Sequence, residues 1–312
     1  MPSSKSSPDS PAVLVLVGPT AVGKTAVAVV LAERFGGEII NCDSMQVYRG
    51  FDIGTDKPGP DERRRVPHHL LDVVDGRTQF TAADFASRAA EAITGIIGRG
   101  RRPIVAGGTG LYMKALFDGL FPGPSRDDIV RSGLDEEARR GGLDVLYDRL
   151  AGIDPAYAAK VGRADRVRIV RALEVHAVTG IPLSVHFERT AGFLPGAATI
   201  KIGLRLDREE LRRRIDARVE RMFQRGLVEE VRGLLAGGIP ETAPPFKALG
   251  YRHVLRILRG EMTTDEAVAA TKIETRRYAK RQMTWFRKAA DVVWFDAAEP
   301  DRIGAFVAGR WT

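Results

Sequence analysis

The chain has 312 residues and a mass of 34.1 kDa, enough for one large domain or for a core with smaller attachments. A hydrophobic fraction of 44% is ordinary for a globular protein, and no run approaches the roughly 20 apolar residues that cross a bilayer. The only cysteine, Cys42, excludes an intrachain disulfide framework and a cysteine-based zinc site, and it fits a reducing compartment such as the cytoplasm.

The net charge of +8 is unevenly distributed. Residues 201–290 contain 21 Lys and Arg against 12 Asp and Glu, so the C-terminal part carries the excess. A polyanionic partner and a well-solvated helical surface both explain this balance. Residues 1–10 lack the apolar segment of a signal peptide, and we expect them to form a disordered leader.

The first part of the chain alternates strand and helix signals. Residues 12–17 form a short apolar run typical of a strand buried on both faces, and residues 25–35 have helical periodicity. Further strands are predicted at 38–41 and 103–106. The alternation predicts an α/β fold with a parallel sheet flanked by helices, whose first part spans residues 11–117.

Strand signals vanish in the middle of the chain, where charged, helix-favouring segments predict a helical insertion over residues 118–197. Alternating character returns at 201–206, so residues 198–312 are expected to complete the core and to end in basic helices.

A phosphate-binding motif separates the first predicted strand from the first helix. The segment satisfies G-x-x-x-x-G-K-[ST] with Gly18, Pro19, Thr20, Ala21, Val22, Gly23, Lys24 and Thr25. In such a P-loop the backbone N–H groups surround phosphate oxygens at a helix N-terminus. Lys24 would reach a terminal phosphate, and the Thr25 hydroxyl would ligate Mg²⁺. The motif therefore predicts a phosphorylated ligand and a P-loop NTPase-like core.

The carboxylate expected of an ATPase is missing. The strand at 103–106 runs into a Gly-Gly-Thr-Gly turn at 107–110 and ends in no acidic residue that could help to hold Mg²⁺. We expect a use of the loop other than ATP turnover.

Polar residues follow the second predicted strand, at the sheet edge where ligands of open α/β folds bind. Asp43 is succeeded there by Ser44 and Gln46. Asp43 would either cap a helix or accept a proton from a nucleophile held opposite the P-loop. Nearby, His68 and His69 lack a third ligand at metal-binding spacing, and we expect packing or supporting roles for them.

Asp207 begins a predicted helix whose apolar stripe includes Ile215 and Met222. Arg218 lies at the edge of that stripe and should have an anionic partner, either an acidic side chain or a bound phosphate. Arg212 also lies near the stripe, so periodicity does not single out Arg218.

The segment 272–288 contains seven basic residues and one acidic residue. Basic side chains at four-residue spacing could follow a nucleic-acid backbone. The interleaved Tyr278, Trp285 and Phe286 would either stack on bases or, as is more usual, pack in the core.

Seven blocks in this order resemble the tRNA dimethylallyltransferases, also called tRNA isopentenyltransferases. The blocks are GPTAVGKT (18–25), DSMQVYRGFDIGTDKP (43–58), PHHLLD (67–72), GGTGLY (107–112), RALEVHAVTG (171–180), ALGYR (248–252) and TRRYAKRQMTWFR (275–287). The resemblance covers about residues 12–290. A P-loop alone is shared by very many proteins, whereas the ordered set is highly specific.

The resemblance implies transfer of a dimethylallyl group from dimethylallyl diphosphate to the exocyclic amine of adenosine 37 in tRNA, next to the anticodon. The P-loop would hold the diphosphate, with Lys24, Thr25, Mg²⁺ and Arg218 neutralising the leaving group. Asp43 matches the general base of the family, and Thr109 would help to fix the amine.

The family's tRNA contacts would fall on the residues Asp43, Ser44, Met45, Gln46, Thr109, Val167, Arg168, Ile169, Val170, Arg171, Lys247, Ala248, Leu249, Gly250, Tyr251 and Arg252. The insertion would clasp the anticodon stem-loop. We expect no membrane association and a monomer.

Some positions depart from the family pattern. Cys42 and Asp56 stand where Ala is frequent, and residues 161–165 replace a more typical His-Pro-Asn-Asp run. Two rivals remain. A small-molecule or nucleoside kinase would keep Lys24 and Asp43 but use ATP, and a non-catalytic RNA-binding protein would need neither Asp43 nor the complete P-loop.

Overall fold

The computed structural model describes residues 12–121, 123–124, 126–188, 190, 192–194 and 197–311. Two compact units are present. One is built from both ends of the chain, up to Phe117 and from Phe193 onward, and the other comprises Asp118–Gly192. The sequence predicts the insertion over residues 118–197, and the predicted leader, residues 1–10, lies outside the described residues.

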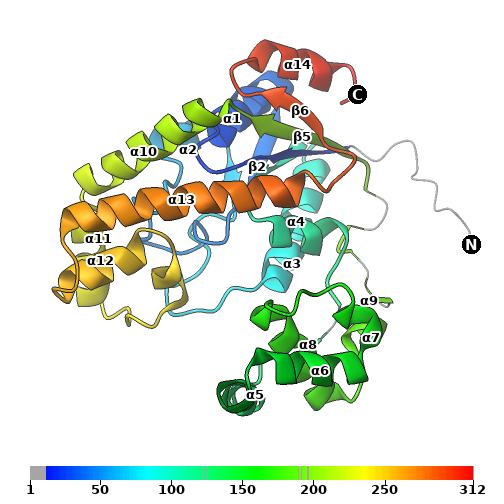
Figure 1. Ribbon diagram of the computed structural model, residues 1–312. Helices are drawn as coiled ribbons and strands as arrows, with labels where there is room; N and C mark the ends of the chain where they lie inside the picture. Colours follow the sequence, from blue (N-terminus) through cyan, green and yellow to red (C-terminus); the bar gives the residue numbers. More distant parts are fainter. Residues whose placement is uncertain are drawn as a thin grey trace, which may run out of the picture. The chain divides into compact units, whose positions relative to one another are not determined.

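A parallel sheet forms the centre of the first unit (Figure 1). Its strands are β1 (Val13–Val17), β2 (Gly37–Cys42), β3 (His68–His69), β4 (Arg102–Gly107), β5 (Thr199–Arg205) and β6 (Val293–Asp296). They lie in the order β3-β2-β4-β1-β5-β6, and every neighbouring pair is parallel. All five residues of β1 are buried, as expected for a central strand covered on both faces.

The helices of this unit surround the sheet and extend it on one side. They are α1 (Lys24–Phe35), α2 (Pro60–Arg65), α3 (Ala82–Gly98), α4 (Gly110–Phe117), α10 (Arg208–Gln224), α11 (Leu227–Ala236), the 3-10 helix η1 (Pro244–Lys247), α12 (Tyr251–Leu258), α13 (Thr264–Phe286) and α14 (Pro300–Ala308). The predicted α/β class is confirmed, because the sheet is parallel and flanked by helices.

The sequence did not indicate β3, β6 or α14. β3 has only two residues, paired with Ile39 and Ile40, and both of its side chains are imidazoles. β6 is an edge strand in which Val293 is exposed and Phe295 is buried. Short edge strands lack the continuous apolar run that reveals a central strand.

The second unit is a small helical bundle. Its helices are α5 (Asp128–Gly141), α6 (Leu143–Ile153), α7 (Pro155–Ala158), α8 (Arg166–Thr179) and α9 (Leu183–Glu188). They enclose a core of their own that includes Leu146, Leu150, Ile169 and Leu173. Among the described residues, no helix combines the length and the apolar character needed to span a bilayer.

The chain leaves and re-enters the first unit at neighbouring points. The Phe193 N–H donates to the Leu116 carbonyl at 3.2 Å, so the two ends of the excursion meet. The strands before and after the excursion, β4 and β5, are the two neighbours of β1. The insertion therefore separates β4 from β5 along the chain, while both strands still pair with β1.

Candidate active site

The P-loop begins where β1 ends and closes where α1 begins. Gly23, the residue before the helix, has φ +102°, a left-handed conformation that favours glycine, and Ala21 has φ +64°. No side chain caps the first turn of α1. Its backbone N–H groups and the positive end of the helix dipole are consequently available to an anion.

Lys24 folds back over this loop. Its Nζ donates to the carbonyl oxygens of Gly18 at 3.0 Å and Pro19 at 2.8 Å. Burial lowers the pKa of Lys24 to about 8, the Asp43 carboxylate partly offsets this effect, and the Arg218 guanidinium adds to it. The amine is thus largely protonated at neutral pH, but it sits where a further negative charge would stabilise it.

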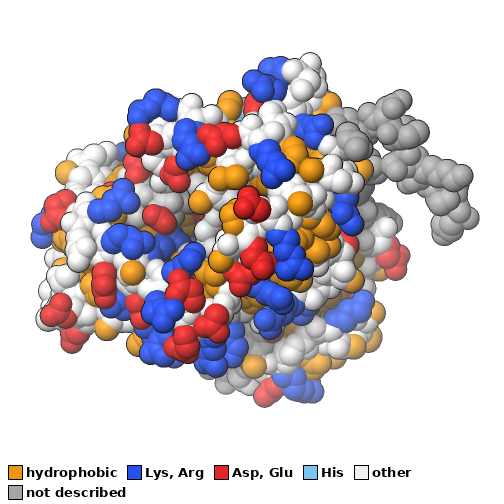
Figure 2. All heavy atoms as spheres, turned by 90° about the horizontal axis from the view of Figure 1, so that it is seen from above, with side chains coloured by type: hydrophobic (Ala, Val, Ile, Leu, Met, Phe, Trp, Pro, Cys, Tyr) orange, Lys and Arg blue, Asp and Glu red, His pale blue; other side chains and the backbone are white. Residues whose placement is uncertain are grey.

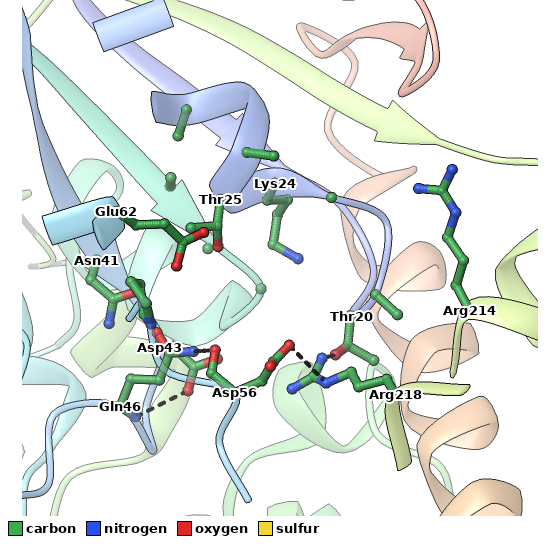
Figure 3. Close-up of a pocket in the computed structure, with 18 of the residues that line it drawn as sticks. Thr20, Lys24, Thr25, Asn41, Asp43, Gln46, Asp56, Glu62, Arg214 and Arg218 are labelled. Atoms are coloured by element: carbon green, nitrogen blue, oxygen red, sulfur yellow. Dashed lines mark hydrogen bonds and ion pairs between the residues drawn. The ribbon is translucent and has the colours of Figure 1, made fainter. Parts of the chain in front are cut away.

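A pocket of about 620 Å³ opens in front of the loop, a size suited to a small-molecule ligand. Its wall combines the P-loop, the ends of β2 and β4, the 52–58 loop and helices α2, α10 and α13. The polar lining residues include Thr20, Lys24, Thr25, Asn41, Asp43, Gln46, Asp56, Glu62, His68, Arg214, Arg218, Tyr278 and Gln282. Figure 3 shows Lys24, Asp56 and Arg218 facing the same space.

Asp43 caps a turn rather than a helix, and it also lines the pocket. Its Oδ1 accepts the N–H groups of Met45 at 2.8 Å and Gln46 at 3.4 Å, so it caps the turn that follows β2. The same side chain lines the pocket. Within the described part of the chain, Oδ2 accepts no hydrogen bond, which leaves one carboxylate oxygen for a ligand.

Thr109, which follows the neighbouring strand β4, supports that turn. Its Oγ1 accepts the Ser44 N–H at 3.1 Å, and its own N–H donates to the Cys42 carbonyl at 3.3 Å. Thr109 itself is not among the residues that line the pocket. Gln46 is buried and donates to the carbonyls of Thr55 and Asp56, at 3.0 and 3.2 Å.

Arg218 meets the P-loop and an acidic side chain at the same time. Its guanidinium donates to Thr20 Oγ1 and, at 3.3 Å, to the Thr55 carbonyl, and its Nε lies 3.2 Å from Asp56 Oδ2. Arg212 points to solvent. The structure therefore separates two arginines that helical periodicity alone did not.

Two residues of α13 line the pocket: Tyr278, which the sequence left between base stacking and core packing, and Gln282, which it did not single out. Gln282 Oε1 accepts the Thr20 N–H at 2.8 Å, and Nε2 donates to the Gly108 carbonyl at 2.9 Å. A Cβ at Gly108 would collide with this amide, which explains that glycine. Tyr278 lines the pocket one turn earlier, and burial raises its pKa to about 12. The signal was the repeat of uncharged polar residues on one face of a basic helix.

The basic residues of α13 and of the two positions that follow it fall into two groups. Lys272 pairs with Glu220 at 2.5 Å, and Arg276 pairs with Asp216, both on α10. The other group is exposed and, in the chain as described, forms no ion pair: Arg277, Lys280, Arg281, Arg287 and Lys288. On the face shown in Figure 2, basic and acidic side chains lie among one another. Phe286 packs in the core, whereas Trp285 is exposed.

The predicted tRNA-contacting stretches contain both surface and interior residues. The exposed ones are Val167, Arg168, Lys247 and Arg252, and the half-buried ones are Ser44, Met45, Arg171, Ala248 and Leu249. The interior ones are Gln46, Ile169, Val170, Gly250 and Tyr251. Tyr251 donates to Glu230 at 2.6 Å and packs on Phe51, so its structural role here is internal.

The histidines make local contacts. His69 Nε2 lies 2.7 Å from Glu38, and His68 Nδ1 lies 2.8 Å from the Val66 carbonyl. Among the described residues, no group of three His, Cys, Asp or Glu could hold a metal ion. The Thr25 hydroxyl in the pocket fits Mg²⁺, which retains several waters and takes substrate phosphate oxygens together with few protein ligands.

A P-loop facing a carboxylate at the edge of a parallel sheet defines a P-loop protein built for a phosphorylated ligand. Comparison with known proteins gives the family. Residues 46–289 match the model of the IPP transferase family. The tRNA dimethylallyltransferase of Geobacter metallireducens is 51% identical over 283 residues, 91% of this chain and 92% of its own. That of Thermomicrobium roseum is 46% identical over 92% of this chain and 87% of its own.

Solved structures agree. The tRNA isopentenylpyrophosphate transferase of Bacillus halodurans superposes with a TM-score of 0.70 at 40% identity, over 96% of both chains. A eukaryotic dimethylallyltransferase acting on tRNA gives 0.76 at 30% identity, over 96% of this chain and 77% of its own. The chain belongs to the IPP transferase family, the tRNA dimethylallyltransferases. The predicted resemblance is confirmed, and the kinase alternative is not supported.

Proposed function

We propose that this protein transfers a dimethylallyl group from dimethylallyl diphosphate to the exocyclic amine of the adenosine next to the anticodon of tRNA, releasing diphosphate. One observation carries the proposal: the phosphate-binding loop and the Asp43 carboxylate line a single pocket in a member of this family. The lone cysteine and the tRNA substrate fit a cytoplasmic enzyme.

The P-loop side of the pocket would stabilise the leaving group. When the allylic carbon–oxygen bond breaks, the electron pair departs with the diphosphate, and the carbon develops cationic character. Lys24, the N–H groups at the start of α1 and the Arg218 guanidinium, which all border the pocket, would stabilise this growing negative charge. Mg²⁺ bound at Thr25 would supply further charge neutralisation.

The opposite side would handle the nucleophile. The adenine amine attacks the allylic carbon, a C–N bond forms, and the amine then loses a proton. Asp43 Oδ2 is the acceptor, since Oδ1 is held by the turn. Thr109 acts on this step by fixing the turn through Ser44 rather than by lining the pocket. Because adenine amines are poor nucleophiles, alignment in a confined site contributes much of the rate.

The RNA would lie along exposed basic side chains. Arg277, Lys280 and Arg281 project from the same helix that supplies Gln282 to the pocket. Phosphate contacts of this kind position a nucleic acid without reading its bases. Flipping the target adenine costs a few kcal/mol, least in a single-stranded loop. An anticodon loop meets that requirement.

The test is a reconstitution with purified protein, unmodified tRNA, dimethylallyl diphosphate and Mg²⁺, without ATP. Mass spectrometry of the tRNA nucleosides should reveal prenylated adenosine. Asp43→Asn keeps an oxygen for the turn but no base, and it should lower kcat/KM by about 10²–10⁴. Its tRNA affinity should stay within about twofold, since phosphate contacts supply most of that affinity. ATP-dependent phosphorylation of a small acceptor, without prenylation, would refute the proposal.

A further inference from the structure

Asp56 brings a carboxylate into the pocket, beside the arginine assigned to the leaving group. Its Oδ2 lies 3.2 Å from Arg218 Nε, and both residues line the pocket. Asp56 stands where the family resemblance leads us to expect Ala. An acid in an anion-binding site opposes the binding of the anion, so its presence needs an explanation.

The loop that carries Asp56 is rigidly held. The N–H groups of residues 52, 53 and 54 converge on Glu230, at 3.0, 2.7 and 3.3 Å. Gln46 holds the Asp56 carbonyl at 3.2 Å, and buried Lys57 bonds to two carboxylates at 2.6 Å each. Because hydrogen bonds hold the backbone on both sides of Asp56, the fold fixes the position of its carboxylate in the pocket.

Arg218 is not fully engaged by these partners. Its terminal nitrogens donate to Thr20 and Thr55, but the buried Nε has no hydrogen-bond partner among the described residues, because Asp56 is close without being aligned. The carboxylate therefore neutralises the guanidinium while leaving a donor open. A phosphate oxygen entering the pocket could take that donor and displace or share the Asp56 contact.

We propose that Asp56 is an internal counter-ion that holds Arg218 in position before the substrate binds and lowers the affinity for the diphosphate group. The inference rests on the proposed function, in which diphosphate is both part of the substrate and the released product. A diphosphate site of higher affinity would bind substrate and product alike. It would lower KM without raising kcat, and it would slow the release of diphosphate. Asp56 would thus favour turnover over retention of the product.

The experiment measures binding of inorganic diphosphate to the full chain by calorimetry, with and without Mg²⁺. Asp56 has φ +54°, so Asp56→Asn is the suitable variant, because Asn tolerates the left-handed region better than Ala. Binding should tighten by about five- to tenfold, a moderate effect because the carboxylate is half exposed and screened. In steady-state assays KM for the isoprenoid should fall more than kcat changes.

Two controls isolate the ion pair. Asp61→Asn removes the same charge from exposed α2, outside the pocket, and should leave affinity unchanged. In an Arg218→Met background, Asp56→Asn should have less than about a third of its effect, since coupled residues are non-additive. Equal effects in both backgrounds would indicate that Asp56 simply repels the diphosphate. That result would overturn the proposal that Asp56 acts as a counter-ion of Arg218.

Weaker Mg²⁺-dependent binding by Asp56→Asn would mean that the carboxylate ligates the metal, and it would also overturn the proposal. Unchanged affinity would do the same. If the wild-type chain binds no diphosphate at all, the proposed function itself fails. Thermal melting of each variant shows whether it is folded.

Discussion

Two charged sites of this protein, one in each unit, differ in whether their charges are paired. In the helical unit, the fully buried Glu174 accepts from Arg131 at 2.9 and 3.0 Å, from Arg171 at 2.7 Å and from the Asp127 N–H at 2.8 Å. Burial alone would raise the pKa of Glu174, but these hydrogen bonds outweigh it and lower the pKa to about 2. Every charge in this cluster has its partner.

In the pocket in front of the P-loop, by contrast, several charged groups lack full hydrogen bonding among the described residues. Within that part of the chain, Lys24 donates hydrogen bonds only to carbonyl oxygens, Asp43 has an oxygen without a hydrogen bond, and Arg218 keeps a buried donor unpaired. Unsatisfied buried polar groups are costly and persist where a ligand completes them. The contrast distinguishes charges that are paired within the fold from charges in the pocket that keep hydrogen-bonding capacity for a ligand.

The largest effect expected from this comparison concerns Glu174. Glu174→Gln leaves two arginines facing a neutral group, and breaking such a pair should cost about 3–5 kcal/mol of stability in the helical unit. Hydrogen exchange of peptides from α5 and α8 measures the loss. Glu136→Gln on the surface of α5 is the control and should cost under about 1 kcal/mol.

The pH dependence has a definite sign. Since folding lowers the pKa of Glu174 from its ordinary value of 4.5 to about 2, its contribution to stability is present above pH 4.5 and disappears as pH falls toward 2. The difference between the wild type and Glu174→Gln should therefore vanish in acid. A difference that persists at pH 2 would show that packing, not charge, sets the cost.

A smaller effect is expected at Lys24. Its pKa of about 8 means that the amine loses its proton as pH rises through 8, and with it the attraction for diphosphate. Affinity should fall about fivefold between pH 8 and 9, the change in the protonated fraction of a group with that pKa. Lys24→Arg stays charged and should lack this decline. The comparison therefore distinguishes titration of Lys24 from titration of the diphosphate. Identical profiles would assign the decline to diphosphate.

The last expected effect, similar in size to that at Lys24, concerns the exposed basic surface of α13. Replacing both Lys280 and Arg281 by Ala should weaken tRNA binding by about three- to tenfold and reduce its salt slope by about 1–2. Lys272→Ala is the matched control, because Lys272 is already paired with Glu220. An equal loss in the control would show that the general charge of the chain, rather than this surface, attracts RNA.

The sequence predicted the elements and motifs that are formed by consecutive residues. β1, the P-loop and the Asp43 turn are each written within a few consecutive positions, and the motif blocks identified the family. Gln282 and Asp56 were not recognised as partners of the P-loop. Gln282 reaches Thr20 across 262 positions, and the Asp56–Arg218 pair forms only when the 52–58 loop meets α10. Helical periodicity marks the face of α13 that carries Gln282, but the partner of each side chain follows from tertiary folding.

The bond between Leu116 and Phe193 also bears on how such a protein can change. Because the two ends of the insertion already touch, the sheet pairs as it would if the excursion were a short loop. An inserted domain whose two ends lie close together tolerates exchange, lengthening or loss, since the domain that carries it keeps its own core. The helical unit can therefore change in sequence or length while the first unit keeps its sheet and the pocket in front of the P-loop.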